Sequence, residues 1–301
     1  MKTFKKTLLL MLVLVLGMQG FAEQAASTIT VTDMAGFEIA LDKPASRIVA
    51  LAAADCEILY ALGAGDLLVG RGEYCDYPEE VKNVESVQSG YQTNIEQLLM
   101  LEPDVVIMPI MSQTIEQEEA LRAAGIQVVI SDAQDIEGVY TAIKLLGAIT
   151  AKNEEAAKLC EDMQAVFNEI RSDASGKTVY FEVSPLEWGL WTAGTGTFMN
   201  EIAQICGLEN AFSDVSGWQA ISEEQVLERD PDYIVTITMY YGSGLTPIEE
   251  IASRPGWDTL KAVSAGGIYN ADSDMLSRPG PRLADAAKAF YDFITGNEAI
   301  Q

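Results

Sequence analysis

The chain has 301 residues and a formal net charge of -26, with 45 acidic and 19 basic side chains and no histidine. This charge excludes a nucleic-acid partner, because phosphate backbones require basic surface. The lack of histidine excludes Ser-His-Asp and Cys-His catalysis and histidine-ligated zinc, haem or cobalt. The length suits two domains, and a hydrophobic content of 49% is enough for their cores.

Residues 1–22 have the pattern of an export signal. Three of the first six residues are lysines, Leu8–Leu16 is apolar, and Ala22 offers a small residue for cleavage. The apolar run is too short for a convincing membrane span, and no cysteine near the cleavage point could carry a lipid anchor. We therefore expect an exported, soluble protein of the periplasm.

The cysteines of the chain lack the Cys-x-x-Cys spacing of zinc and redox motifs. They are Cys56, Cys75, Cys160 and Cys206. In an exported protein Cys56 and Cys75 are the pair that we consider for a disulfide, and buried free thiols are the alternative.

Apolar runs and helical patterns alternate through the first half of the mature chain. Thr28–Asp42 alternates in polarity on both sides of a turn, which predicts a small hairpin. The ranges that follow it are, in order, strand Arg47–Leu51, helix Ala54–Leu62, strand Leu67–Gly70, strand Val105–Met108, helix Gln113–Ala124 and strand Gln127–Ile130. This order predicts a parallel sheet with helices on both faces.

Two consecutive helical patterns, Ile136–Ile149 and Asn153–Ile170, separate this half from a second alternating half that begins with strand Thr178–Val183. We expect an α/β fold with a first lobe at 28–150, a stiff linker helix at 151–174 and a second lobe at 177–301. Gly194-Thr195-Gly196 precedes a helix but lacks the third glycine of a dinucleotide-binding loop, so it is a weak signal.

One stretch occurs twice, as Asn94–Ile107 and as Ser222–Val235, at a constant offset of 128 residues. Each copy has a helix-capping residue, a Glu-Gln pair, a short apolar run, Pro-Asp and an apolar strand. Gln97 and Gln225 are placed to reach back to the cap, which predicts a capping box in both copies. A repeat at this distance fits two similar lobes.

Each copy also places a glutamate, Glu96 or Glu224, in the first turn of its helix. One interpretation is that these acids only complement the helix dipole. The other is that they form a pair of acidic knobs, one on each lobe, for a two-fold symmetric partner.

In their order and spacing, several pieces of the chain resemble the solute-binding proteins of bacterial ABC importers for iron–siderophore complexes, haem and cobalamin. The pieces are Asp76-Tyr77-Pro78, the two repeated stretches, Pro255-Gly256-Trp257 and Arg278-Pro279-Gly280-Pro281-Arg282. The resemblance extends from about Arg47 to about Phe293. It implies two Rossmann-like lobes with parallel central sheets, joined by a single long α-helix, with a ligand cleft between them.

The resemblance also implies roles for individual residues. Glu96 and Glu224 match the glutamates that dock on arginines of the dimeric permease. Tyr74 and Trp218 match cleft aromatics of cobalamin-binding members, and Tyr91 lies one position from a cleft tryptophan of those members. Asp274 and Arg278 match a polar pair near the cleft floor. The alternative for Arg278 is an ordinary surface ion pair.

Three further aromatic residues, Trp188, Trp191 and Tyr240, are candidates for the cleft, with packing inside the second lobe as the alternative. Aromatic faces with a few polar groups suit a large, flat, semi-polar ligand. Arg278 and Arg71 are the only arginines that we expect near the cleft, which favours a neutral or weakly charged ligand. Haem would need a tyrosine ligand, such as Tyr74 or Tyr91.

We therefore expect a monomeric, non-enzymatic protein without a resident cofactor. It would capture a metal chelate, either a corrinoid such as cobalamin, which we favour, or a ferric siderophore, and deliver it to an ABC importer permease. The alternative is an exported two-lobed enzyme of the oxidoreductase type. The missing glycine motif and the missing histidines count against it. A structural or adhesive role is a third hypothesis, and it predicts that the protein has no ligand cleft.

Overall fold

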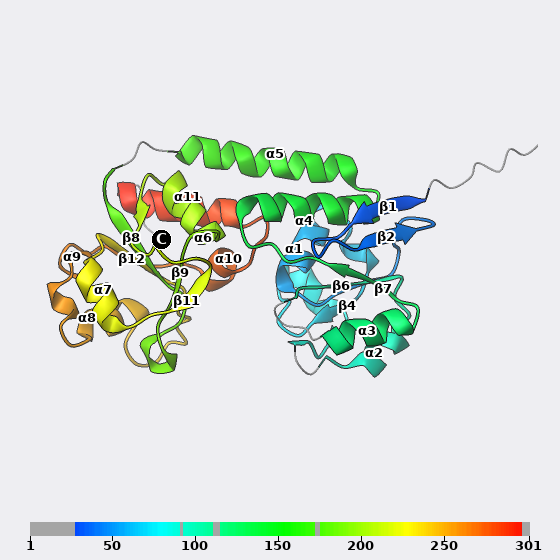
Figure 1. Ribbon diagram of the computed structural model, residues 1–301, viewed down its shortest axis with the longest axis horizontal. Helices are drawn as coiled ribbons and strands as arrows, with labels where there is room; N and C mark the ends of the chain where they lie inside the picture. The colour runs from blue at the N-terminus through cyan, green and yellow to red at the C-terminus, as the bar shows by residue number, and fades with distance from the viewer. Residues whose placement is uncertain (1–27, 91–92, 111–114, 172–174, 297–301) are drawn as a thin grey trace, which may run out of the picture.

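The computed structural model describes residues 28–90, 93–110, 115–171 and 175–296. They form two α/β lobes side by side, with long helices running across one side of both (Figure 1). The predicted fold class is confirmed. The expected signal segment, residues 1–22, and Tyr91 lie outside the described residues. Within the part of the chain that is described, no helix combines the length and the apolar character needed to cross a bilayer.

The first lobe is built on a five-stranded sheet in the order β5-β4-β3-β6-β7, with every pair parallel. Its strands are β3 (Ile48–Ala50), β4 (Leu68–Gly72), β5 (Ser86–Val87), β6 (Val105–Met108) and β7 (Gln127–Ile130). Its helices are α1 (Ala53–Ala61), α2 (Ile95–Met100), α3 (Ile115–Ala123) and α4 (Ile136–Ile149). The hairpin β1 (Ile29–Thr32) and β2 (Glu38–Leu41) is antiparallel, as predicted.

The central strands of this sheet are buried on both faces, which explains their uninterrupted apolar sequences. Along β6, Val105 and Ile107 pack with α1 and α4, whereas Val106 and Met108 pack with α2 and α3. Successive side chains of a strand point to opposite faces, so both layers of helices are held by the same short strands.

The second lobe has a parallel sheet in the order β10-β8-β12-β13 and a separate antiparallel ladder of β9 and β11. Its strands are β8 (Thr178–Glu182), β9 (Trp191–Ala193), β10 (Glu209–Asn210), β11 (Trp218–Ala220), β12 (Tyr233–Thr236) and β13 (Ile268–Asn270). Its helices are α6 (Phe198–Ile205), α7 (Glu223–Arg229), α8 (Pro247–Ser253), α9 (Lys261–Ser264), α10 (Ser273–Ser277) and α11 (Leu283–Thr295). Short 3₁₀ helices occur at Gly65–Leu67, Glu79–Asn83, Leu186–Trp188 and Trp257–Thr259.

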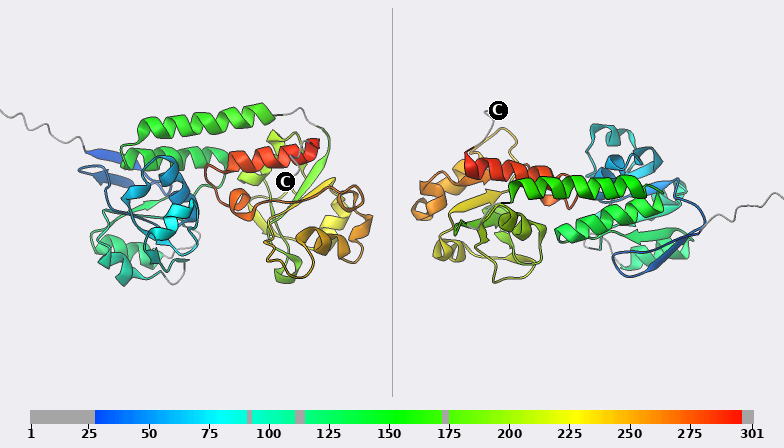
Figure 2. Two further views of the ribbon diagram at one scale, coloured as in Figure 1. Left: turned by 180° about the vertical axis from the view of Figure 1, so that it is seen from behind. Right: turned by 90° about the horizontal axis from the view of Figure 1, so that it is seen from above.

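Helix α5 (Asn153–Ile170) connects the two lobes and packs along both α4 and α11 (Figures 1 and 2). Its buried residues recur every three or four positions, at Ala156, Cys160, Met163, Phe167 and Ile170. They join one core cluster that contains residues of both lobes. Apolar packing of one helix against both lobes resists their separation. The stiff connector and the domain boundaries remain predictions.

The repeated stretch folds in the same way in both lobes, with one difference at its cap. Ser222 and Gln225 form the full capping box at the start of α7, as predicted. Asn94 caps α2 by accepting a hydrogen bond from the backbone of Gln97, but the side chain of Gln97 donates to Ser86 O at 2.8 Å. The capping-box prediction is therefore wrong for the first copy, because the backbone N–H of Asn94 donates to Gln88 O at 3.1 Å and not to the side chain of Gln97.

All four cysteines are buried free thiols. The sulfur atoms of Cys56 and Cys75 lie 3.7 and 3.9 Å from the same carbonyl oxygen, that of Ala50. Of the two alternatives drawn from the sequence, this structure has the buried free thiols.

Candidate functional site: a cavity between the lobes

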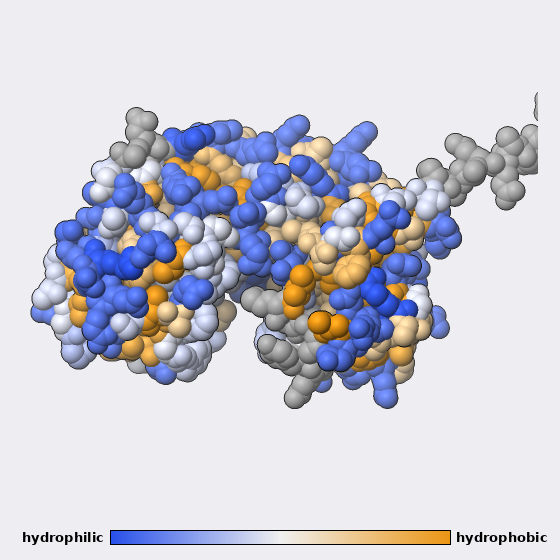
Figure 3. Space-filling view, viewed as in Figure 1, coloured by the Kyte–Doolittle hydropathy of each residue, from blue (hydrophilic) through white to orange (hydrophobic). Residues whose placement is uncertain are grey.

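A cavity of about 310 Å³ lies where the two lobes meet. The space-filling view shows that the molecule is hollowed between the lobes (Figure 3). The residues that line this cavity are Leu51, Ala52, Ala53, Ala54, Asp55, Tyr74, Ser89, Gly90, Pro109, Ser131, Asp132, Ala133, Gln134, Phe198, Trp218, Ser277, Arg278 and Pro279. They come from both lobes and are mainly apolar, which is typical of a small-molecule site.

The wall from the first lobe consists largely of residues that directly follow parallel strands. Residues 51–55 follow β3, Pro109 follows β6, and residues 131–134 follow β7. The carboxyl ends of parallel strands share one edge of a sheet, so these loops converge. Tyr74 joins them from the loop after β4 and is an exposed aromatic side chain.

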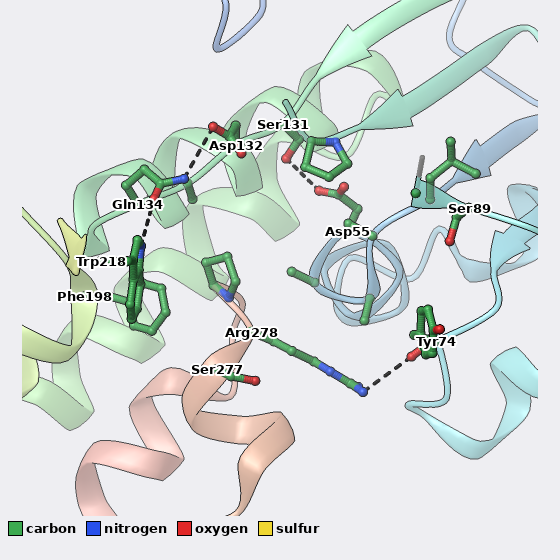
Figure 4. Close-up of a pocket in the computed structure, with 18 residues that line it drawn as sticks. Asp55, Tyr74, Ser89, Ser131, Asp132, Gln134, Phe198, Trp218, Ser277 and Arg278 are labelled. Carbon is green, nitrogen blue, oxygen red and sulfur yellow. Dashed lines mark hydrogen bonds between the residues drawn. The ribbon is translucent and has the colours of Figure 1, made fainter. Parts of the chain in front are cut away.

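The wall from the second lobe presents two aromatic rings. Phe198 and Trp218 lie 5.3 Å apart between centroids at an interplanar angle of 58°. The indole N–H of Trp218 donates to Gln134 Oε1 at 3.2 Å, and the backbone N–H of Phe198 donates to Gln134 O at 2.9 Å. Gln134 therefore joins the lobes at this edge of the cavity and fixes the indole plane (Figure 4).

Arg278 crosses the cavity floor from the second lobe toward the first. Its Nη1 donates to Asp76 Oδ1 at 2.7 Å and to Glu57 Oε1 at 3.1 Å, and its Nη2 lies 2.8 Å from Asp274 Oδ1. Burial of Asp76 acts in the opposite direction, but the hydrogen bond and charge of Arg278 lower the pKa of Asp76. Three carboxylates surround one guanidinium, so it is not free to hold an anionic ligand. Arg278 therefore forms an ion pair with Asp274, as the alternative interpretation of the sequence predicted, and it also lines the cavity.

Asp55 lies in the cavity wall in the first turn of α1 and is only 2% exposed. Its Oδ1 accepts a hydrogen bond of 2.6 Å from Ser131 Oγ. Burial, together with the charge of Asp132, raises the pKa of Asp55 to about 7, against the hydrogen bond from Ser131. Oδ2 of Asp55 has no hydrogen-bond partner among the described residues.

The structure brings together only part of the predicted ligand-binding set. Tyr74, Trp218 and Arg278 line the cavity, and Asp274 is paired with Arg278 beside it. Tyr240 and Asp274 line a separate hollow on the second lobe. Tyr91 is outside the described residues.

The two remaining tryptophans are not among the residues that line the cavity. Trp188 is 77% exposed at the end of a 3₁₀ helix, and Trp191 is paired with Ala220 in the ladder of β9 and β11. Neither tryptophan packs in the core of the second lobe, which was the alternative prediction, because both side chains are exposed. The proposed docking residues Glu96 and Glu224 are exposed in the first turns of α2 and α7, one in each lobe.

Sequence reasoning missed six residues that shape the site. These are Glu57, Asp55, Ser131, Asp132, Gln134 and Phe198. Four of them follow the carboxyl ends of β3 or β7, where ligand sites of parallel sheets occur. The residues that follow the predicted strands could therefore have been named as candidate site residues from the sequence alone.

Two α/β lobes joined by one long helix, with an aromatic cavity between them, define a two-lobed ligand-binding protein. Comparison with known proteins gives its family. Residues 48–275 match the family model described as periplasmic binding protein. The chain belongs to this family, and the resemblance stated from its sequence is confirmed.

Individual relatives cover most of the chain. The uncharacterized ABC transporter substrate-binding lipoprotein YvrC of Bacillus subtilis is 32% identical over 88% of this chain and 85% of its own. The periplasmic vitamin B12 binding protein BtuF of Vibrio cholerae is 28% identical, with a TM-score of 0.70 over 85% of this chain and 99% of its own. A possible iron-binding periplasmic solute-binding protein of Staphylococcus epidermidis is 30% identical, with a TM-score of 0.72 over 84% and 99%.

Proposed function

We propose that this chain captures a metal chelate in the cavity between its lobes and delivers it to the permease of an ABC importer. A corrinoid is the favoured ligand, and a ferric siderophore is the other candidate. The observation that carries this proposal is the pair of aromatic walls, Tyr74 on one lobe and Trp218 on the other. Arg278, the one basic side chain among the described lining residues, is already paired.

The chemistry of the cavity supports a large ligand with little net charge. Aromatic faces on opposite walls provide contact area for a flat macrocycle at a low cost in side-chain entropy. An anionic chelate would require free arginines, whereas the guanidinium of Arg278 is held by Glu57, Asp76 and Asp274. The similarity to a vitamin B12 binding protein supports a corrinoid as the ligand. The similarity to a possible iron-binding protein is the reason to test ferric siderophores as well.

Delivery requires export and a surface for the permease. The basic and apolar pattern of residues 1–22 supports export, and the first cysteine of the sequence is Cys56, so we propose a soluble rather than a lipid-anchored mature protein. Glu96 and Glu224 supply one exposed carboxylate on each lobe for a two-fold symmetric partner. The function is capture and delivery by a monomer, not catalysis.

A tryptophan-fluorescence titration of residues 23–301 tests the ligand. Cyanocobalamin, a panel of ferric siderophores and haemin are added in turn to the wild type, to Trp218→Ala and to Trp188→Ala as the matched control outside the cavity. We expect saturable binding of cyanocobalamin that is lost in Trp218→Ala and kept in Trp188→Ala. Saturable binding of a siderophore alone would make a siderophore, not a corrinoid, the proposed ligand. Absence of binding by every ligand of the panel would overturn the proposed function.

A further inference from the structure

Among the described residues, one wall of the cavity carries two acidic side chains and no basic one. Asp55 rises from α1 toward Ser131, and Asp132 lies next to Ser131 just beyond the end of β7 (Figure 4). Among the described residues that line the cavity, Arg278 is the one basic side chain. Its charge is taken up by Glu57, Asp76 and Asp274, so nothing in this lining offsets the two acids.

Asp55 is the inner member of this pair. Ser131 satisfies Oδ1, but Oδ2 has no hydrogen-bond partner among the described residues, although the side chain is almost completely buried. A buried polar atom that lacks a partner is unfavourable, and native proteins keep few of them. Burial also raises the pKa of Asp55 to about 7, as expected for a carboxyl group without a counter-charge.

Asp132 is the outer, partly exposed member. The amide of Gln134 donates to its Oδ2 at 3.4 Å, which is longer than most N–H···O hydrogen bonds. The same amide group of Gln134 accepts from the indole of Trp218 through Oε1. The backbone N–H of Ile110 also donates to Asp132. A ligand donor would therefore replace the long contact from Gln134, and it would lie beside the aromatic wall.

We propose that Asp55 and Asp132 form an acceptor subsite that receives an N–H group of the ligand and discriminates against a carboxylate at the same place. The ligand group is a carboxamide or an ammonium, since both present N–H donors to a carboxylate. At pH 8, above the pKa of about 7 of Asp55, the two acidic groups repel a third carboxylate, so the subsite supplies selectivity as well as affinity. This inference rests on the proposed function and narrows its ligand class.

Two matched pairs of ligands show whether the subsite recognises a carboxamide or an ammonium. Cyanocobalamin is compared with a derivative in which one carboxamide is hydrolysed to the acid. Ferrioxamine B, which ends in an ammonium group, is compared with its N-succinyl derivative, which ends in a carboxylate. For the pair whose donor is recognised, we expect the member that ends in the carboxamide or the ammonium to bind about tenfold or more tightly than the member that ends in the carboxylate, the worth of a hydrogen bond to a charged group.

The variants Asp132→Asn and Asp55→Asn should bring the two affinities of that pair to within about threefold, because they remove the repulsion and weaken the acceptor. Asp258→Asn changes the net charge equally at an exposed position of a 3₁₀ helix outside the cavity and should leave the ratio unchanged. Circular dichroism confirms that each variant is folded.

The outcomes separate this inference from the proposed function. Equal affinities within both pairs for the wild type, or a ratio that neither variant alters, would overturn the subsite and leave chelate capture standing. A panel in which no ligand binds would overturn both.

Discussion

Glu57 and Arg278 lie 221 positions apart in sequence and join the two lobes beneath the cavity, with Arg278 Nη1 at 3.1 Å from Glu57 Oε1. Glu57 also accepts two hydrogen bonds from Arg282, at 2.6 and 2.8 Å, and its side chain is only 2% exposed. One buried carboxylate of α1 therefore holds two arginines of the other lobe. This contact positions Arg278 at the cavity floor.

Replacing Glu57 by alanine should destabilise the protein by about 3–5 kcal/mol, because two largely buried guanidinium groups would lose their shared partner. Urea denaturation followed by circular dichroism measures this change. Glu79→Ala removes an exposed carboxylate that is paired with Lys82 and should change stability by less than about 1 kcal/mol. Equal effects of the two substitutions would show that the contact between the lobes is not a major source of stability.

Asp55→Asn should stabilise the protein increasingly as the pH rises. The pKa of Asp55 is raised from 3.8 to about 7 in the folded state, chiefly by burial. The native state therefore holds a proton that the unfolded state has already lost, and wild-type stability falls as the pH rises from about 4 to about 7. Asparagine does not titrate, so the variant escapes this loss.

The difference in unfolding free energy between Asp55→Asn and the wild type should be smallest near pH 4 and should reach up to about 4 kcal/mol at pH 8. Urea titrations at several pH values measure it, and the difference between the proteins removes the contribution of other carboxyl groups. A difference that stays constant with pH would mean that Asp55 titrates normally.

The fold followed from the sequence because its signals are local. Apolar runs such as Val105–Met108 are ended by prolines and glycines, and their alternation with helical patterns requires parallel pairing. The short strands β5, β9, β10 and β11 were missed, since two or three residues have no period of their own. Tertiary pairing defines them.

The site was only partly predictable, for a related reason. Tyr74, Trp218 and Arg278 were found through motifs that resemble those of a family. Two of the three carboxylate partners of Arg278, Asp76 and Glu57, lie 202 and 221 positions away, and no local pattern links them to it. Asp55 is an ordinary first-turn acid until the sheet order places it opposite Ser131. Trp188 and Trp191 were chosen for residue type alone, and the structure places both outside the cavity lining.

Trp218→Phe should weaken ligand binding less than Trp218→Ala. Phenylalanine keeps an aromatic ring beside Phe198 but loses the indole N–H that donates to Gln134, whereas alanine removes the whole face. An aromatic pair contributes about 0.5–1.5 kcal/mol beyond its buried area, so we expect about a threefold to tenfold difference in affinity between the two variants. Fluorescence titration would give both constants. Identical losses would assign the role of Trp218 to its N–H.

Substituting the two exposed glutamates should separate capture from delivery. Glu96→Lys and Glu224→Lys change carboxylates in the first turns of α2 and α7, outside the cavity lining, so ligand affinity should stay within about twofold of the wild type. Transport through a reconstituted importer should fall, because reversing a charge at an interface slows association and misaligns the partners. The double variant should lose more than either single one.

Glu228→Lys provides the control for this experiment, since it reverses an exposed charge on the same helix as Glu224. Ligand affinity is measured by titration, and delivery by uptake of the labelled ligand into vesicles that contain the permease. If docking depends on the two first-turn glutamates, uptake falls for Glu96→Lys and Glu224→Lys but not for Glu228→Lys. Equal losses for all three variants would attribute the effect to overall charge. Full uptake by the double variant would show that the two glutamates do not dock the permease and only complement their helix dipoles.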